Sequence, residues 1–170
     1  MKRIAEFERV SYSIFQESCA AFPAWIDDSA GRGMYDRIRL PQRATQGSAG
    51  YDFFLPFPLR LAPGESCSVP TGIRAKMEYG WVLMIYPKSG LGFRYRLQLD
   101  NTVGIVDADY YGARNEGHII IRVTNDGKAG ETLALDAGKA FAQGVFLEFG
   151  ITCSDAAAGE RSGGFGSTGA

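Results

Sequence analysis

From Tyr51 onward, the chain is a series of short apolar segments separated by turn signals. The segments that we predict as strands are 51–55, 66–76, 79–87, 95–100, 118–125, 131–135 and 140–149. Glycine-containing turns lie between several of them, among them Pro63-Gly64, Thr71-Gly72, Asn125-Asp126-Gly127 and Asp136-Ala137-Gly138. Short strands at this spacing are typical of a β-sandwich, a jelly roll or a barrel. The sequence therefore predicts an all-β domain.

The first 50 residues do not follow this pattern. Residues 4–10 alternate imperfectly between apolar and charged types, which predicts a short strand. Residues 11–22 predict a helix, because Ser11 can cap its start and Pro23 stops it. Residues 27–33 are polar and contain glycine, and we expect a loop there.

Composition and charge exclude several classes of function. The chain has 170 residues and a net charge of −1, without a run of basic residues that would indicate nucleic-acid binding. No apolar run is long enough to span a bilayer, and the N-terminus has no signal-peptide pattern. Cys19, Cys67 and Cys153 have neither metal-ligand spacing nor a disulfide pattern, so we expect a reducing cytoplasm.

The stretch 104–112 is the strongest candidate for chemistry, since two carboxylates and two tyrosines lie between glycines. On an extended strand Asp107 and Asp109 would share a face, whereas the glycines favour a bend or hairpin. A carboxylate on a rigid hairpin suits a general base, and a tyrosine ring suits a sugar or base. The alternative is a solvated acidic pair on a surface hairpin. The single histidine, His118, precedes a predicted strand and is expected to be packed rather than catalytic.

Two further stretches carry features of phosphate binding. Residues 86–92 place Lys88 and Ser89 among small residues after a strand, although the spacing of a Walker loop is absent. Residues 161–169 combine glycines, whose amides can form an anion-binding nest, with Arg161, Ser167 and Thr168. Phe165 adds a stacking face. This tail is predicted to be a mobile flap over a phosphorylated, ring-bearing ligand; the alternative is a Gly/Ser-rich end without a function.

Together these stretches resemble the trimeric deoxyuridine triphosphatases (dUTP pyrophosphatases) over about residues 38–169. All five motifs of that family occur in order: Ala49-Gly50-Tyr51-Asp52, Pro87-Lys88-Ser89-Gly90, Asn101 with 104–110 and Gly112, 138–143, and 161–169. The resemblance implies a jelly-roll (β-clip) subunit, a homotrimer with shared sites, and hydrolysis of dUTP to dUMP and pyrophosphate with Mg²⁺. It also implies an insertion at about 11–35 within a β domain of residues 1–153, followed by a linker and flexible arm at 154–170.

The resemblance assigns a role to each motif residue. Asp107 would activate the water that attacks the α-phosphate, and Asp52 would hold Mg²⁺ through water. The uracil edge would be read by Asn101 and the backbone of Gly104, Ile105 and Val106, and Tyr110 would pack on the deoxyribose. The phosphates would contact Lys88, Ser89, Gly90, Gln143, Arg161, Gly166, Ser167 and Thr168, and Phe165 would stack on uracil.

Two positions depart from the family pattern, since Lys88 and Ala140 stand where arginine is usual. Two alternative functions remain open at this point. A dCTP deaminase shares the fold and binds a similar nucleotide. A β-sandwich regulatory module would instead bind a protein partner through the insertion at 11–35.

Overall fold

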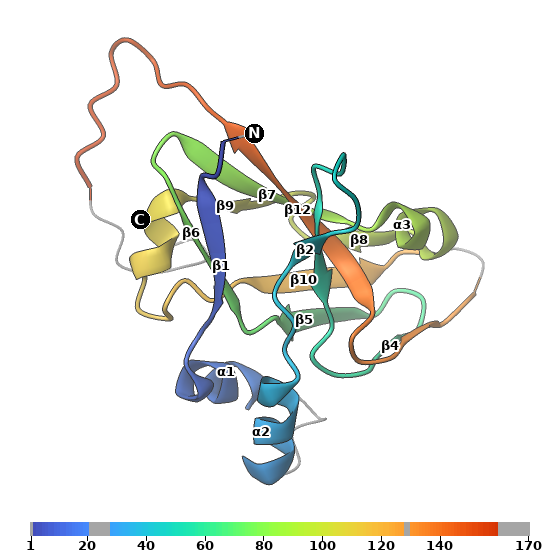
Figure 1. Ribbon diagram of the computed structural model, residues 1–170. Helices are drawn as coiled ribbons and strands as arrows, with labels where there is room; N and C mark the ends of the chain where they lie inside the picture. The colour runs from blue at the N-terminus through green and yellow to red at the C-terminus, as the bar shows by residue number, and fades with distance from the viewer. Residues whose placement is uncertain (1, 21–27, 128–129, 160–170) are drawn as a thin grey trace.

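The largest sheet supports the motifs that the sequence singles out. The computed structural model describes residues 2–20, 28–127 and 130–159. Within these residues a five-stranded sheet has the order β2 (Gln42–Arg43), β3 (Tyr51–Phe54), β12 (Ala140–Glu148), β7 (Trp81–Pro87) and β9 (Gly104–Val106). All of its pairings are antiparallel, and β12 lies at its centre. Figure 1 shows β12 running beside β7 across the molecule.

Three smaller antiparallel sheets complete the β body. One has the order β5 (Ser66–Pro70), β10 (Ile120–Asn125) and β8 (Leu97–Leu99). The others pair β4 (Leu59–Leu61) with β11 (Leu133–Leu135), and β1 (Ala5–Arg9) with β6 (Ile73–Met77). Each predicted strand segment contains a strand, although 66–76 is divided into β5 and β6, and β2, β4 and β9 were not among the predicted strands.

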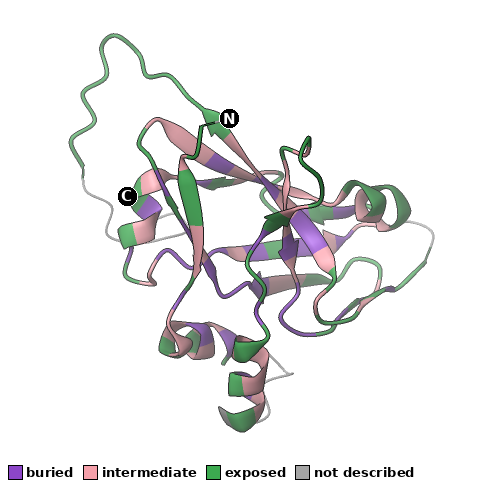
Figure 2. Ribbon diagram, in the orientation of Figure 1, coloured by how far each residue is buried: buried purple, intermediate pink, exposed green. Residues whose placement is uncertain are grey.

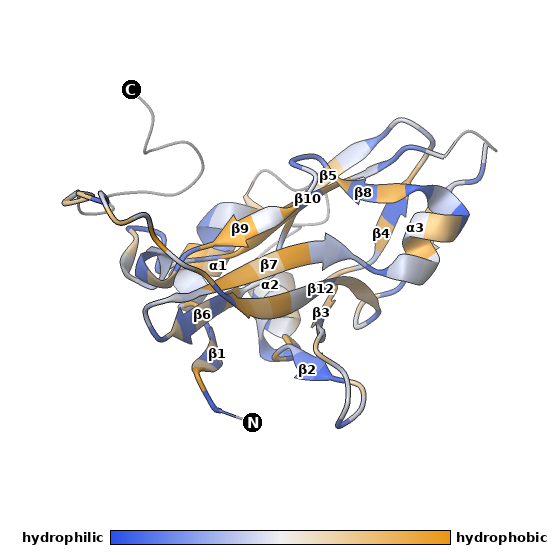
Figure 3. Ribbon diagram, turned by 90° about the horizontal axis from the view of Figure 1, so that it is seen from above, coloured by the Kyte–Doolittle hydropathy of each residue, from blue (hydrophilic) through white to orange (hydrophobic). Residues whose placement is uncertain are grey.

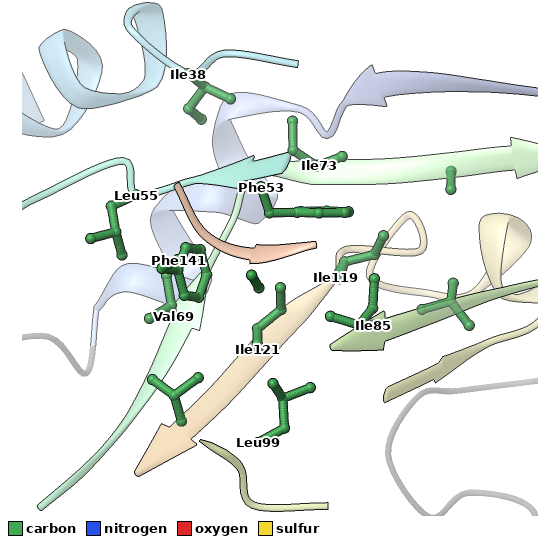
Figure 4. Packing of buried hydrophobic residues seen from close by; sticks show 14 of the residues in the cluster. Ile38, Phe53, Leu55, Val69, Ile73, Ile85, Leu99, Ile119, Ile121 and Phe141 are labelled. Atoms are coloured by element: carbon green, nitrogen blue, oxygen red, sulfur yellow. The ribbon is translucent and has the colours of Figure 1, made fainter. Parts of the chain in front are cut away.

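The core forms where the inner faces of these sheets meet. Phe53, Leu83, Phe141 and Val123 are fully buried and come from four different strands. Side chains of this size each contribute about 1.5–3 kcal/mol when fully buried. Figure 4 shows Phe53 and Phe141 among isoleucines and valines of the facing strands, and Figure 2 shows the burial concentrated along the middle of the sheets. No described buried side-chain nitrogen or oxygen atom lacks a hydrogen-bond partner.

The predicted strand 66–76 is wrong, because the chain breaks at Gly72 into β5 and β6. Gly72 has φ +72°, and a Cβ there would lie 2.3 Å from Cδ1 of Ile38. Its carbonyl accepts a hydrogen bond from the amide of Val10, at 3.0 Å. Only glycine adopts this conformation without strain, so the Thr71-Gly72 turn signal prevails over the apolar run.

The two N-terminal helices differ in how well the sequence predicts them. Helix α1 (Tyr12–Cys19) starts as predicted, with the Ser11 side chain accepting a hydrogen bond from the amide of Ile14 at 3.4 Å. Helix α2 (Asp28–Asp36) overlaps the predicted loop 27–33, which is therefore wrong. Tertiary contacts explain the difference: the Tyr35 hydroxyl donates to the Val10 carbonyl at 2.6 Å, and its ring packs against Phe15. Both helices lie at one end of the β body (Figure 1).

Two other short helices were not predicted, namely α3 (Ser89–Tyr95) and the 3-10 helix η1 (Ala108–Gly112). After β12, residues 149–159 form an exposed segment without helix or strand that leaves the body (Figure 2). The predicted arm beyond it lies outside the described residues.

In the part of the chain that is described, no helix is long and apolar enough to cross a membrane. Figure 3 shows hydrophobic residues along strands such as β7 and β9.

Candidate functional site

A cavity of about 490 Å³ opens beside the stretch that the sequence marks as the site of chemistry. Strands β8, β9 and β10 and the helix η1 contribute to its wall. Six of the residues that the resemblance assigns to the substrate line it: Asn101, Gly104, Ile105, Val106, Asp107 and Tyr110. The structure thus brings six residues of the third motif together around one hollow.

The position of Asp107 follows from the way β9 ends. Gly104 pairs with Ile85 and Val106 pairs with Leu83 on β7, so the backbone before Asp107 is fixed by the sheet. The chain then turns, and Asp107 is the N-cap residue of η1. Asp109 lies inside η1 and is exposed, whereas Asp107 is half-buried at the cavity. The bend that the glycines favoured is therefore present, and the two carboxylates do not share the face of a strand.

Tyr110 is held by hydrogen bonds at its hydroxyl group. Its side chain is buried, with 8% of the residue exposed. The hydroxyl donates to the carbonyl oxygen of His118 at 2.9 Å and accepts from Nδ2 of Asn115 at 2.8 Å. Because both partners are fixed in the turn that precedes β10, the ring has a defined position in the cavity wall.

A third contact ties η1 to the N-terminal strand. The Tyr111 hydroxyl donates to Oε2 of Glu8 at 2.9 Å, and the guanidinium of Arg74 lies over the Tyr111 ring and 2.6 Å from the same carboxylate oxygen. The hydrogen bond from Tyr111, together with Arg74, lowers the pKa of Glu8, and the same hydrogen bond raises the pKa of Tyr111. Strands β1 and β6 therefore brace η1 through Glu8 and Arg74.

Sequence reasoning missed the apolar wall of the cavity. This wall consists of Ile85, Leu99, Ile119 and Ile121, all of which are buried. Figure 4 shows Ile85, Leu99 and Ile121 gathered from three neighbouring strands. A signal existed, since residues two apart on a strand share a face and Ile119 and Ile121 therefore point the same way. Nothing in the sequence indicates that the face with Ile119 and Ile121 lies toward β9.

A second group of predicted residues lies on the large sheet, around β3 and β12. Asp52 and Gln143 are directly opposite on these two strands, so their side chains share one face of the sheet. Nζ of Lys88 lies 2.8 Å from Oδ1 of Asp52. Gln143 also faces the first motif, because a Cβ at Gly50 would lie 2.9 Å from its Oε1.

Ser89 and Gly90 follow Lys88 and begin α3, where both are exposed. Among the described residues, neither they nor Asp52, Lys88 or Gln143 line the cavity. The structure therefore collects the predicted residues into two groups, one around Asp107 and one around the Lys88–Asp52 pair. The remaining predicted residues lie outside the described part of the chain: Arg161, Phe165, Gly166, Ser167 and Thr168.

The described residues contain no group of three or more histidine, cysteine, aspartate or glutamate side chains that could hold a metal ion. The histidine behaves as the sequence predicts, because His118 is fully buried. Burial lowers the pKa of His118 to about 4, opposed in part by the carboxylate of Glu116, so the ring is neutral at pH 7. Acid–base chemistry in the described residues of the cavity therefore falls to carboxylates.

Comparisons with known proteins agree with the five motifs. The family model described as dUTPase matches residues 36–169. The deoxyuridine 5'-triphosphate nucleotidohydrolase of Lactococcus lactis subsp. lactis (strain IL1403) is 40% identical over 136 residues, covering 78% of this chain and 89% of the relative.

Comparison with solved structures also finds similarity to dUTPases. The crystal structure of the dUTPase from Streptococcus mutans has a TM-score of 0.60 and 38% identity, covering 66% of this chain and 88% of that chain. A variant of the dUTPase from phage phi11 of S. aureus, described with the coordination of a structural Mg(II) ion, has a TM-score of 0.64. At 18% identity, covering 91% of this chain and 97% of that one, it supports the fold alone. The predicted jelly-roll fold is confirmed by these likenesses.

Proposed function

The chain belongs to the dUTPase family, and from this premise we propose how its residues hydrolyse dUTP to dUMP and pyrophosphate. The single observation that carries the proposal is the cavity in which Asp107, Tyr110 and the backbone of β9 meet. It combines a carboxylate, a flat aromatic ring and a rigid backbone edge, which are the elements that a water-activating nucleotide site needs.

Asp107 acts as the general base. It orients a water molecule and takes its proton while the water oxygen bonds to the α-phosphorus and the bridging oxygen to the β-phosphate leaves. The half-buried position of Asp107 at the end of β9 supports this role, because the sheet fixes the carboxylate relative to the nucleotide. Among the described residues that line the cavity, no histidine competes for the role.

The nucleoside occupies the cavity itself. Asn101 and the backbone of Gly104 and Val106 read the uracil edge, with Ile105 beside them, and Tyr110 packs on the deoxyribose. Pairing of β9 with β7 supports this assignment, since a backbone held in a sheet cannot retreat from a 5-methyl group. A fixed Tyr110 ring leaves no room for a 2′-hydroxyl group, which favours dUTP over UTP.

The phosphates extend toward the second group of residues. Lys88, Ser89, Gly90 and Gln143 contact them, and Arg161, Gly166, Ser167 and Thr168 close over them while Phe165 stacks on uracil. Lys88 supplies charge without the two-pronged geometry of arginine, and Ala140 supplies none. The cluster of Lys88, Asp52 and Gln143 on one face of the sheet supports this assignment.

The donor set fits a Mg²⁺ ion that is bound mainly through the substrate. Mg²⁺ keeps several water ligands and is commonly held by one or two carboxylates plus phosphate oxygens, so no dedicated protein cage is needed. Asp52 is a half-buried carboxylate beside the residues that are proposed to contact the phosphates, and it would hold the ion through water. When bound, Mg²⁺ neutralises the charge that develops on the phosphate oxygens.

The remaining features of the chain complete the proposal. We place one β domain at 1–153, with an insertion at 11–35, followed by a linker and arm at 154–170. The working form is a homotrimer in which the two groups of residues complete one another across subunit boundaries. The free thiols of Cys19, Cys67 and Cys153 suit the cytoplasm.

The function is tested by measuring pyrophosphate release from dUTP, dTTP, dCTP, dATP and dGTP with Mg²⁺, and ammonia release from dCTP. We expect pyrophosphate from dUTP and little from the others, dTTP included, because overpacking a rigid site costs roughly 1–3 kcal/mol. Ammonia from dCTP would instead establish the deaminase. No turnover of any nucleotide would leave a binding module that acts through the insertion at 11–35.

A further inference from the structure

His118 takes no part in the proposed chemistry, yet both of its ring nitrogens are engaged. Nε2 lies 2.8 Å from the backbone nitrogen of Gly72, which can only donate a hydrogen bond, so Nε2 is the acceptor. Nδ1 therefore carries the proton and donates to Oγ of Ser18 at 3.0 Å. Ser18 in turn donates to the carbonyl of Ile14 at 2.9 Å. The ring is thus fixed in one tautomer and one orientation by helix α1 and the β5–β6 turn.

The main chain of the same residue holds Tyr110. The His118 carbonyl is the acceptor for the Tyr110 hydroxyl, at 2.9 Å. Gly117 makes this approach possible, because it has φ +71° and a Cβ there would lie only 2.7 Å from the Tyr110 carbonyl oxygen. The side chain of His118 therefore anchors the turn whose backbone anchors the tyrosine.

Helix α1 contacts this turn at a second point. The backbone amide of Ser11, the N-cap residue of α1, donates to Oε2 of Glu116 at 2.7 Å. The two contacts, Ser11 to Glu116 and Ser18 to His118, fall near opposite ends of α1 and on the same turn. Helix α1 also lies before residue 36, where the match to the dUTPase family model begins. The support comes from a part of the chain that the family match does not cover.

We propose that His118, held by Ser18 of α1, is a positioning residue that keeps Tyr110 against the sugar subsite and so sets selectivity for deoxyribose over ribose. This inference rests on the proposed function, since it assigns a role to α1 in that same site. The N-terminal helix then supports the wall of the active site from behind, although no residue of it lines the cavity. A looser Tyr110 admits the 2′-hydroxyl group of UTP.

A purely structural role for His118 makes a different prediction. A buried histidine that only stabilises the fold lowers the melting temperature when its contacts are lost, and it changes the rates with dUTP and UTP equally. The proposal requires the ratio of kcat/KM for dUTP to that for UTP to change. The ratio is therefore the decisive measurement.

The primary variant is Ser18→Ala, which removes the acceptor for Nδ1 and leaves the His118 ring in place. Ser13→Ala is the matched control, because Ser13 is an exposed serine on the same helix. We expect Ser18→Ala to lower the dUTP/UTP ratio roughly 3- to 10-fold, the effect of about one lost hydrogen bond, mainly by a gain of UTP turnover. Ser13→Ala should keep the wild-type ratio.

A double-mutant cycle then shows whether the effect runs through the tyrosine. Tyr110→Phe breaks the bond to the His118 carbonyl directly, so adding Ser18→Ala to it should change the ratio no further. Hydrogen exchange gives a readout without nucleotide: the amides of Gly117 and Ile119 should exchange faster in Ser18→Ala than in Ser13→Ala. His118→Gln, which keeps an acceptor for the Gly72 amide, should show an intermediate ratio.

Two results would overturn the inference. The first is a Ser18→Ala variant that turns over dUTP at the wild-type rate and has the wild-type ratio of kcat/KM for dUTP to kcat/KM for UTP. The second is a double variant in which the effects of Ser18→Ala and Tyr110→Phe on this ratio add fully. Failure of the proposed function is recognised separately, because the wild-type protein itself would then release no pyrophosphate from dUTP, and the inference would fall with it.

Discussion

Lys88 and Asp52 form an ion pair in which Nζ lies 2.8 Å from Oδ1, although 36 residues separate them in the chain. The pair joins the start of α3 to β3 on the face of the sheet where Gln143 also lies. Each partner has a proposed role with the nucleotide, Lys88 with phosphate and Asp52 with the Mg²⁺ ion. The contact fixes the position of both side chains.

Asp52→Asn should raise the Mg²⁺ concentration that gives half-maximal activity several-fold, because the water-mediated carboxylate contact is lost. The free energy of unfolding should change by roughly 1 kcal/mol or less, as for other partly exposed ion pairs. Magnesium titrations of dUTP turnover provide the measurement. Glu78→Gln is a suitable control, since it breaks an exposed pair of similar length, 2.7 Å, with Lys2. Identical magnesium curves for Asp52→Asn and wild type would remove Asp52 from the metal site.

Asp107→Asn should lower kcat about 10²–10⁴-fold, the usual effect of losing a general base. Nucleotide affinity should stay close to that of the wild type, since the amide keeps the shape of the side chain; calorimetry with a non-hydrolysable dUTP analogue measures it. Asp109→Asn, an exposed carboxylate two residues away, serves as the comparison and should have a far smaller effect. A rate near that of the wild type in Asp107→Asn would exclude it as the base.

Deletion of residues 160–170 should strongly lower kcat/KM for dUTP while leaving the melting temperature nearly unchanged. The loss is expected because Arg161, Phe165, Ser167 and Thr168 are the proposed contacts from this segment. The melting temperature should hold because all buried apolar residues of the described chain lie between Val10 and Ala142. Phe165→Ala in the full-length chain separates stacking on uracil from the phosphate contacts. Full activity after the deletion would contradict the proposal.

The stability of the protein should fall between pH 7 and pH 5 because of His118. Its pKa is about 4 when folded and about 6.5 when unfolded, so the unfolded chain binds the extra proton first. The stabilisation is complete above pH 6.5 and is lost as the pH falls toward 4, by roughly 2 kcal/mol between pH 7 and pH 5. The carboxyl groups of Glu8 and Glu116 have lowered pKa values and act only at lower pH.

Urea unfolding at several pH values measures this effect. His118→Gln, which does not titrate in this range, should show a flatter dependence between pH 7 and pH 5 than the wild type. Equal slopes in the two proteins would mean that His118 does not bind a proton on unfolding in this range.

Sites shared between subunits should allow two inactive variants to complement one another. Mixed assemblies of Asp107→Asn subunits and subunits that lack residues 160–170 should regain part of the activity that neither has alone. Sedimentation should give three chains per particle. A fully active monomer, or mixtures without any regained turnover, would contradict the shared arrangement.

The sequence predicted the local features of this fold well. Ser11 marked the start of α1, and the turn glycines marked most strand ends. Helix α2 was missed because Gly31 and Gly33 lower helix propensity, by about 1 kcal/mol each, and packing of Tyr35 overrides that cost. Six residues of the third motif line one cavity, so this stretch was placed beside a hollow by the sequence alone.

Contacts between residues far apart in the chain could not be predicted from the sequence. No local pattern announces that Lys88 pairs with Asp52, that Ile119 and Ile121 face β9, or that Ser18 supports His118 across 100 residues. These contacts depend on how the sheets assemble, which hydrophobic periodicity alone does not determine. The chemical roles of the site residues stay predictions until the variants above are measured.

The central place of β12 also governs the order in which the molecule can form. Strand β12 is the partner of both β3 and β7. The two halves of the five-stranded sheet, β2–β3 and β7–β9, therefore cannot join until residues 140–148 have been synthesised. Until then β3 and β7 each expose an unpaired edge, which is a template for association with other chains. On the ribosome the largest sheet therefore closes only after residues 140–148 have been synthesised.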